Sequence, residues 1–104
     1  MTNYYYIATD SLSNTWETAK IEKLLLSFDF LHKQNGKFSS KEPYLIVSLL
    51  KVSNKDSWNE QDYNKDKTNY ISIITDDASE RDIDVKRLLK GLEILLGFNI
   101  RPAD

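Results

Sequence analysis

The feature that most constrains the fold is the run Tyr44 to Val52, "YLIVSLLKV", which is almost entirely apolar and contains β-branched residues. Apolar residues at successive positions are typical of a strand in the middle of a sheet, where both faces are covered. Glu42-Pro43 comes just before the run and favours an extended entry, because a residue before proline is biased away from the helix. We therefore expect a central strand here.

Two further apolar runs predict strands, "YYYIAT" from Tyr4 to Thr9 and "YISIIT" from Tyr70 to Thr75. The end of the chain predicts a helix that Ser79 or Asp82 caps and that Gly97 ends. Its apolar residues recur at helical spacing and predict one buried face: Val85, Leu88, Leu89, Leu92, Leu95 and Leu96.

The segment from Asn14 to Gly36 permits two structures. Asn14 and Glu17 have the spacing of a capping box, and Asn35-Gly36 suits the end of a helix. Alternation over residues 24–30, followed by an Asn-Gly turn signal, would instead suit a strand that returns through Gly36. We favour the helix, because its apolar residues follow one helical face: Ile21, Leu24, Leu25, Phe28 and Leu31.

These segments together predict a single α+β domain that spans residues 1–104. We expect a three-stranded, mainly antiparallel sheet with two helices, in the order β-α-β-β-α. A chain of 104 residues is long enough to bury one core.

Composition narrows the function classes. The formal net charge of −2 argues against a nucleic-acid binder, which needs a basic footprint. No apolar run is long enough to cross a bilayer, so we expect a cytoplasmic protein with no membrane partner. The chain has no cysteine, one histidine (His32) and no phosphate-binding glycine loop. We therefore expect a protein that is not an enzyme and that uses no cofactor or metal.

The long polar connection from Ser53 to Asn69 is the most informative stretch for function. Asp62, Asn64 and Asp66 begin like a calcium loop, but Lys67 replaces its glycine and Ile73 its final glutamate. Loops longer than about 12–15 residues are usually functional or disordered, and aromatic residues argue against disorder. Trp58 and Tyr63 therefore either cap the core or bind a partner.

An acidic run that includes Asp76, Asp77 and Glu80 precedes the last helix. Acids at a helix start interact well with its dipole, and they would also suit a basic partner. Because the last predicted strand separates this run from the long loop, we expect the two at opposite ends of the sheet.

Both predicted helices carry apolar residues opposite their main face, which indicates surplus apolar surface. Either the terminal segment "GFNIRP" covers one of these faces, or they form an oligomer interface. The candidate interface residues are Phe30, Ile83, Arg87 and Ile94.

In its size, acidity, Lys/Asn-rich composition, α+β layout and lack of an active-site motif, the chain resembles bacterial immunity proteins of contact-dependent growth inhibition and related toxin systems. The resemblance implies an inhibitor that occludes the active site of a cognate toxin, of the nuclease type. Within the long loop, its contacts would come from Asp56, Trp58, Glu60, Asp62, Tyr63 and Asp66. The alternatives are a homo-oligomeric assembly protein and, with less support, a carboxylate-dependent enzyme.

Overall fold

A computed structural model describes residues 1–103, apart from the side chain of Glu60. Within these residues, six strands form one antiparallel sheet and two short strands form another. The small sheet pairs β2 (Trp16–Glu17) with β6 (Lys67–Thr68). The main sheet has the spatial order β3 (His32–Gln34), β4 (Lys37–Lys41), β5 (Tyr44–Leu50), β7 (Tyr70–Asp76), β1 (Thr2–Ala8) and β8 (Arg101–Pro102).

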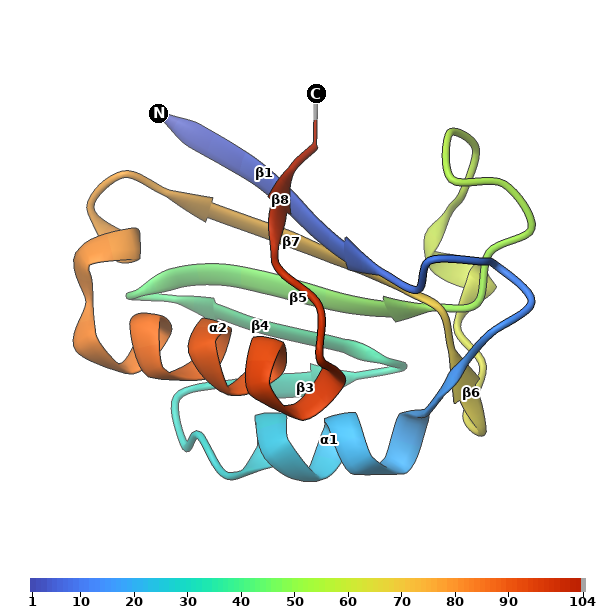
Figure 1. Ribbon diagram of the computed structural model, residues 1–104. Helices are drawn as coiled ribbons and strands as arrows, with labels where there is room; N and C mark the ends of the chain where they lie inside the picture. The colour runs from blue at the N-terminus through green and yellow to red at the C-terminus, as the bar shows by residue number, and fades with distance from the viewer. Residues whose placement is uncertain (104) are drawn as a thin grey trace.

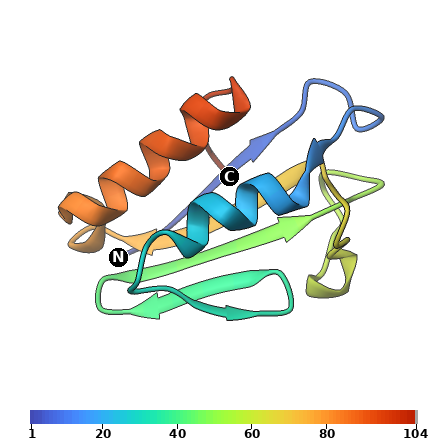
Figure 2. The same cartoon turned by 90° about the horizontal axis from the view of Figure 1, so that it is seen from below.

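The helices α1 (Thr18–Leu26) and α2 (Ile83–Leu96) lie on the same face of the main sheet (Figure 1, Figure 2). Two short 3-10 helices, η1 (Glu60–Asp62) and η2 (Ser79–Arg81), lie in the connections. No described helix is both long and apolar enough to cross a membrane.

The core lies between the helices and this face of the sheet. Side chains alternate along a strand, so every second residue of β5 and β7 points toward the helices. These residues are fully buried, as are the helix residues that meet them. The set comprises Leu45, Val47, Leu49, Ile71 and Ile73 from the strands and Ile21, Leu25, Leu88 and Leu92 from the helices.

The α+β class, the two helices and the antiparallel pairing are confirmed, whereas the strand number and order are wrong. Residues 32–41 form the hairpin β3–β4, in which Asn35 and Gly36 both have positive φ, 49° and 79°. The chain therefore uses Asn-Gly as a hairpin turn and not as a helix end. Helix α1 ends at Leu26, and the rival prediction is right only in that a strand returns through Gly36.

The predicted start of the first helix is also wrong. Residue Glu17 occupies the N-cap position of α1 and makes no side-chain cap hydrogen bond. The helix cannot begin at Asn14, because Trp16 and Glu17 are extended and pair with Thr68 and Lys67 in the small sheet.

Helix α2 closely follows its prediction. The Asp82 side chain accepts hydrogen bonds from the N–H groups of Asp84 and Val85, as an N-cap should. Gly97 ends the helix in the left-handed conformation, with φ of 74°. Of its predicted buried face, Leu95 is the exception, with 44% of its surface exposed.

The terminal segment packs on the main core and not on the surplus apolar face of α2. Phe98 lies edge-to-face against Trp16, with 5.8 Å between ring centroids, and Ile100 contacts the same core. Arg101 and Pro102 then form the edge strand β8 beside β1 (Figure 1). The segment leaves Ile83 and Ile94 uncovered, so it does not account for the surplus apolar surface of α2.

Candidate protein-binding interface

The face of the main sheet that points away from the helices carries a second set of apolar and aromatic residues. None of the described helices covers it (Figure 2). Because these positions alternate with the buried core positions, they project to the opposite side. We call this surface the open face; its central residues are Tyr4, Tyr6, Tyr44, Ile46, Ser48, Ser72 and Ile74.

Cross-strand pairs arrange the open face into rows. Ile74 of β7 lies between Ile46 of β5 and Tyr4 of β1, which makes an apolar row. The neighbouring row places Ser72 between Ser48 and Tyr6. The two serines are small and lie at the sheet centre, so little side-chain volume projects from the sheet there. Tyr4 lies beside them, with 56% of its surface exposed.

Trp58 of the long loop lies at one end of the open face. Its ring is tilted against Tyr70, with 5.9 Å between centroids, and Tyr70 stacks on Tyr6 at 5.5 Å. Tyr70 belongs to a small buried cluster with Leu50 and Val52. Trp58 therefore caps the domain's own second cluster, yet 36% of its surface stays exposed at the rim of the open face.

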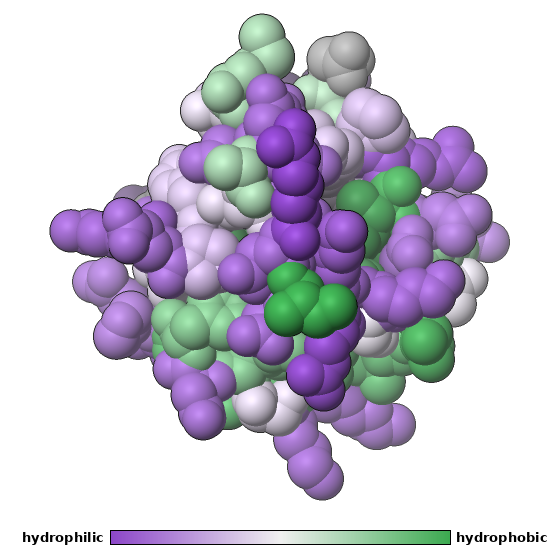
Figure 3. Space-filling view, turned by 90° about the vertical axis from the view of Figure 1, so that its left-hand side faces the viewer, coloured by the Kyte–Doolittle hydropathy of each residue, from purple (hydrophilic) through white to green (hydrophobic). Residues whose placement is uncertain are grey.

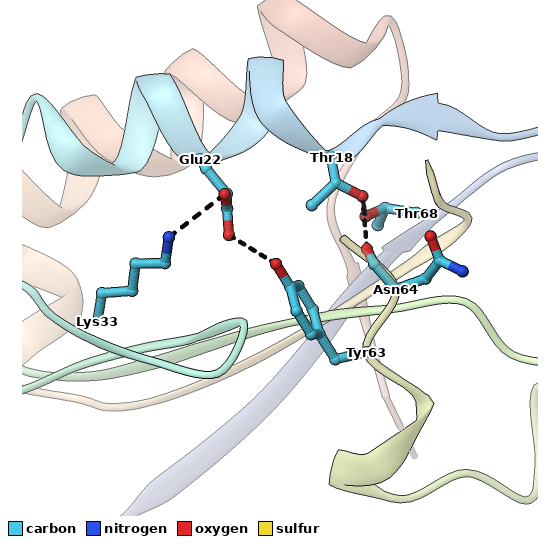
Figure 4. Close-up of polar contacts among 6 residues, drawn as sticks. All are labelled: Thr18, Glu22, Lys33, Tyr63, Asn64 and Thr68. Carbon is cyan, nitrogen blue, oxygen red and sulfur yellow. Dashed lines mark hydrogen bonds and ion pairs between the residues drawn. The ribbon is translucent and has the colours of Figure 1, made fainter. Parts of the chain in front are cut away.

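Tyr63 of the same loop packs on the helix side of the sheet. Its hydroxyl donates to Glu22 of α1 at 3.1 Å, and Glu22 also pairs with Lys33 at 3.5 Å (Figure 4). Its ring contacts the main core and lies on Gly36. Burial, and then the nearby Glu22 carboxylate, raise the pKa of Tyr63. Tyr63 thus holds the loop to the domain, which favours the core-capping alternative.

A buried hydroxyl pair fixes the other end of the loop. The hydroxyl oxygens of Thr18 and Thr68 lie 2.8 Å apart, and the Thr18 hydroxyl donates to the backbone oxygen of Asn64 at 2.9 Å (Figure 4). Both threonines are completely buried. These contacts join the start of α1 to the loop and to β6.

The polar side chains of the loop mostly organise its own backbone. Asp62 accepts from the N–H of Asn59, whose side chain accepts in return, as a capping box for η1. The Asn64 side chain accepts from the N–H groups of Asp66 and Lys67. This accounts for the spacing that resembles a calcium loop. Asp56 and Asp66 are exposed, and the predicted contact Glu60 has its side chain outside the described residues.

The acids before α2 lie at the far end of the sheet from this loop. β7 runs from Tyr70 beside the loop to Asp76 beside η2, so the two groups form no continuous patch, as expected. Asp76 accepts from the N–H of Ser79, which lowers the pKa of Asp76. Asp77 accepts from the Asn3 amide at 2.7 Å. Figure 3 shows this end, where apolar patches are separated by hydrophilic residues.

Glu80 is bound within the domain, by Tyr5 and Asn3 of β1. The Tyr5 hydroxyl donates to Glu80 at 2.5 Å, and the Asn3 amide donates to the same carboxylate. The hydrogen bond to Glu80, followed by burial and the charges of Glu80 and Asp77, raises the pKa of Tyr5 to about 12. Glu80 therefore ties η2 to β1.

This contact predicts an alkaline loss of stability. Since the folded pKa of Tyr5 lies above the unfolded value of about 10, the folded chain holds the proton more tightly. The stabilisation is complete below about pH 10 and is lost between about pH 10 and 12. Tyr5→Phe should make the fall in unfolding free energy over this range shallower. The substitution should not remove this fall entirely, because the pKa values of Tyr63 and Tyr70 are also raised. Urea titrations at several pH values would measure this, and an unchanged slope would contradict it.

The four candidate interface residues do not lie together. Ile83 and Ile94 are exposed on α2, at 68% and 74%, and Arg87 between them lies 3.7 Å from Asp84. Phe30, in contrast, follows α1 and packs against Phe28 with 6.1 Å between ring centroids. The prediction that Phe30 lies on the outer face of the first helix is wrong, because that helix ends at Leu26.

Sequence reasoning missed most of the open face. The run from Tyr44 to Leu50 is so apolar that it concealed the alternation between its two faces. Tyr4 and Tyr6 were visible as alternate aromatic positions in a strand, and this was a usable signal. His32 is exposed on the edge strand β3, opposite Ser39.

Two hollows lie beside β3, β4 and β5. The larger, of about 780 Å³, is lined by residues that include His32, Ser39, Lys41 and Tyr44. The smaller, of about 420 Å³, lies nearer the long loop and is lined in part by Gln61 and Tyr63. Lys37 lines both hollows.

Comparison with known proteins does not identify a family for this chain. No protein-family model matches the chain, and neither does any curated protein or any solved structure.

Proposed function

We propose that this chain is a non-enzymatic inhibitor that binds a cognate bacterial toxin of the nuclease type and covers its active site with the open face. The observation that carries the proposal is a broad sheet face with no described helix over it, on which Tyr4 is exposed and Tyr6, Ile46 and Ile74 are half-buried. Contiguous apolar patches with polar rims mark protein interfaces, and tyrosine and tryptophan are enriched among the residues that dominate binding.

The edges of the main sheet offer less to a partner than its face does. Strand β3 has three residues, all exposed and polar, and strand β8 has two residues, one of them Pro102. Short, charged or proline-containing edges discourage pairing with another chain. A partner therefore meets the side chains of the open face and not the backbone of an edge strand.

Most of the acids that were expected to contact the toxin make hydrogen bonds within the domain, so we assign them a smaller part in binding. Asp62, Asp76 and Glu80 accept hydrogen bonds from the domain's own backbone or side chains. Asp56 and Asp66 remain exposed and can still speed the approach of a basic toxin through long-range attraction. Trp58, at the rim of the open face, is the loop residue best placed to contact the partner.

Binding and inhibition by the open face can be tested with one matched pair of variants. The purified chain is titrated by calorimetry with the toxin domain encoded beside its gene, and toxin activity is followed in parallel. Tyr4→Ala should weaken binding by about tenfold or more, since an exposed aromatic at the interface loses its contacts. Ile94→Ala, which truncates an even more exposed apolar residue on α2, should leave binding unchanged.

Three outcomes count against this proposal. The first is a genome in which no toxin gene adjoins this one. The second is a toxin domain that does not bind. The third is a loss of binding with Ile94→Ala and not with Tyr4→Ala, which would place the interface on α2.

The alternative function, homo-oligomeric assembly, rests on the exposed Ile83 and Ile94. If these residues are an interface, the unmodified chain has the mass of a dimer in light scattering, and Ile94→Asp converts it to a monomer. The inhibitor proposal expects a monomer for both proteins. A dimer that withstands Ile94→Asp would contradict an α2 interface, and Leu26→Asp, on the exposed side of α1, is the control.

A further inference from the structure

The larger hollow of the open face owes its shape to a small residue among long ones. Ser39 lies opposite His32 of β3 on one side and opposite Ile46 of β5 on the other. Along β4, Lys37 and Lys41 project to the same side two residues before and after Ser39. The long side chains form walls around the short serine, and this leaves the hollow of about 780 Å³.

The floor of this hollow is firmly held. The N–H of Tyr44 donates to the Ser79 hydroxyl at 2.8 Å, and its carbonyl oxygen accepts from the Thr75 hydroxyl at 2.7 Å. Phe30 lines the hollow and is supported by Phe28 and the main core. The hollow therefore joins apolar surface to a rigid backbone, which lowers the entropy lost when a ligand binds.

The side chains that line the hollow include two lysines, Lys37 and Lys41, one acid, Glu42, and the imidazole of His32. Lys41 and His32 are exposed, and His32 offers an N–H donor in either protonation state. Two lysines against one acid is the reverse of the balance in the chain as a whole, whose formal net charge is −2.

We propose that this hollow receives an acidic segment of the partner protein, with an aromatic or large aliphatic side chain over Ser39 and a carboxylate beside Lys41 and His32. This inference rests on the proposed function and specifies the chemistry of the partner surface. The apolar part of the segment fills the space between Phe30, Tyr44 and Ile46. Its carboxylate supplies the charge that complements the rim.

Single-stranded nucleic acid fits the open face less well than such a segment. Base recognition on a sheet needs free aromatic faces, whereas Tyr6 and Tyr70 stack on each other and Trp58 covers Tyr70. The negative net charge of the chain also opposes a polyanion. An acidic peptide carries less charge and inserts a side chain, which the hollow has room to take.

The experiment uses the full chain labelled with ¹⁵N and follows its amide signals during titration. The probes are acetyl-Glu-Glu-Phe-Glu-Glu-amide and the matching peptide with lysine in place of glutamate. We expect the acidic peptide to shift the amide signals of Ser39, Lys41 and Ile46, and to bind several-fold more tightly than its lysine counterpart. Added salt should weaken this binding, since the charges are exposed.

Two substitutions and their controls locate the site. Lys41→Glu should weaken binding of the acidic peptide by about tenfold, because it removes one exposed attraction and adds a repulsion. Ser39→Tyr should abolish binding by filling the hollow, and it should fold, because a strand accepts tyrosine at a half-buried position. Lys23→Glu on α1 and Ser57→Tyr in the long loop are the matched controls and should leave binding unchanged.

Each remaining outcome overturns the inference in a distinct way. If both peptides bind equally or shift other amides, the hollow does not select acidic segments. If oligo-dT shifts the same amides and binds more tightly than the acidic peptide, the ligand class is nucleic acid. In both cases the toxin-binding proposal still stands if Tyr4→Ala weakens toxin binding. If Tyr4→Ala has no effect on toxin binding, both the toxin-binding proposal and this inference are wrong.

Discussion

Gly36→Ala is expected to destabilise the chain by about 2–4 kcal/mol, a large effect for the addition of one methyl group. Gly36 has φ of +79°, where alanine is strained. Its new Cβ would also lie 2.1 Å from Cδ1 and 2.6 Å from Cε1 of Tyr63. The ring must therefore move, and it loses both its packing on the core and its hydrogen bond to Glu22. Urea unfolding of the two proteins measures the difference.

Two controls separate backbone strain from the clash. Gly97 has a similar φ of +74°, but an added Cβ there has no atom within 4 Å, so Gly97→Ala should cost only about 1 kcal/mol. In a Tyr63→Ala background, Gly36→Ala should likewise cost about 1 kcal/mol. If Gly36→Ala in the unmodified chain costs no more than Gly97→Ala, then Tyr63 does not pack on the hairpin in solution.

Asn69→Ala is expected to cost about 3–5 kcal/mol, because one buried amide serves three backbone groups. Its side-chain oxygen accepts from the N–H of Val52 at 2.8 Å. Its amide nitrogen donates to the carbonyl oxygens of Leu12 and Val52, each at 3.0 Å. Asn69 is 1% exposed, so water cannot easily replace these bonds. The loss should appear as a lower unfolding midpoint in urea.

The matched control is Asn14→Ala, which removes an exposed amide that donates to Asp10 at 3.2 Å. A surface change of this kind should alter stability by about 0.5 kcal/mol or less. Equal effects at the two positions would mean that the Asn69 network is not formed in solution. Since Asn69 joins the end of the long loop to β5 and to the turn after β1, its loss should also loosen the contact of Trp58 with Tyr70.

The predictions that succeeded came from strong local patterns. Helix α2 combines an apolar face at helical spacing with Asp82 at its start and Gly97 at its end, and these signals agree with one another. The strands β5 and β7 were predicted for a similar reason, since their runs are too apolar to lie in a loop. The position of the long loop followed from the two strands on either side of it.

The segment after α1 shows where local patterns fail. Asn35-Gly36 suits a helix end and a hairpin turn equally, so the dipeptide cannot choose between them. The pairing of β4 with β5 favours the hairpin turn over the helix end, because Phe38 of β4 is completely buried opposite Val47 of β5. A helix through this segment would remove the strand that pairs with β5 and leave that edge of β5 without its ladder of hydrogen bonds.

The candidate site also depends on contacts between residues that are distant in the sequence. Alternation along β1, β5 and β7 assigns their residues to two faces, and this much can be found in the amino-acid sequence. It does not say which face the helices cover. Strands β1 and β7 pair Tyr4 with Ile74, seventy residues further along the chain, and β7 then brings Ile46 beside them. The helices cover the other face because Ile21, Leu25, Leu88 and Leu92 pack there. The chain's own patterns thus defined β1, β5, β7 and α2, whereas packing between distant segments decided the β3–β4 hairpin and left the open face without a helix over it.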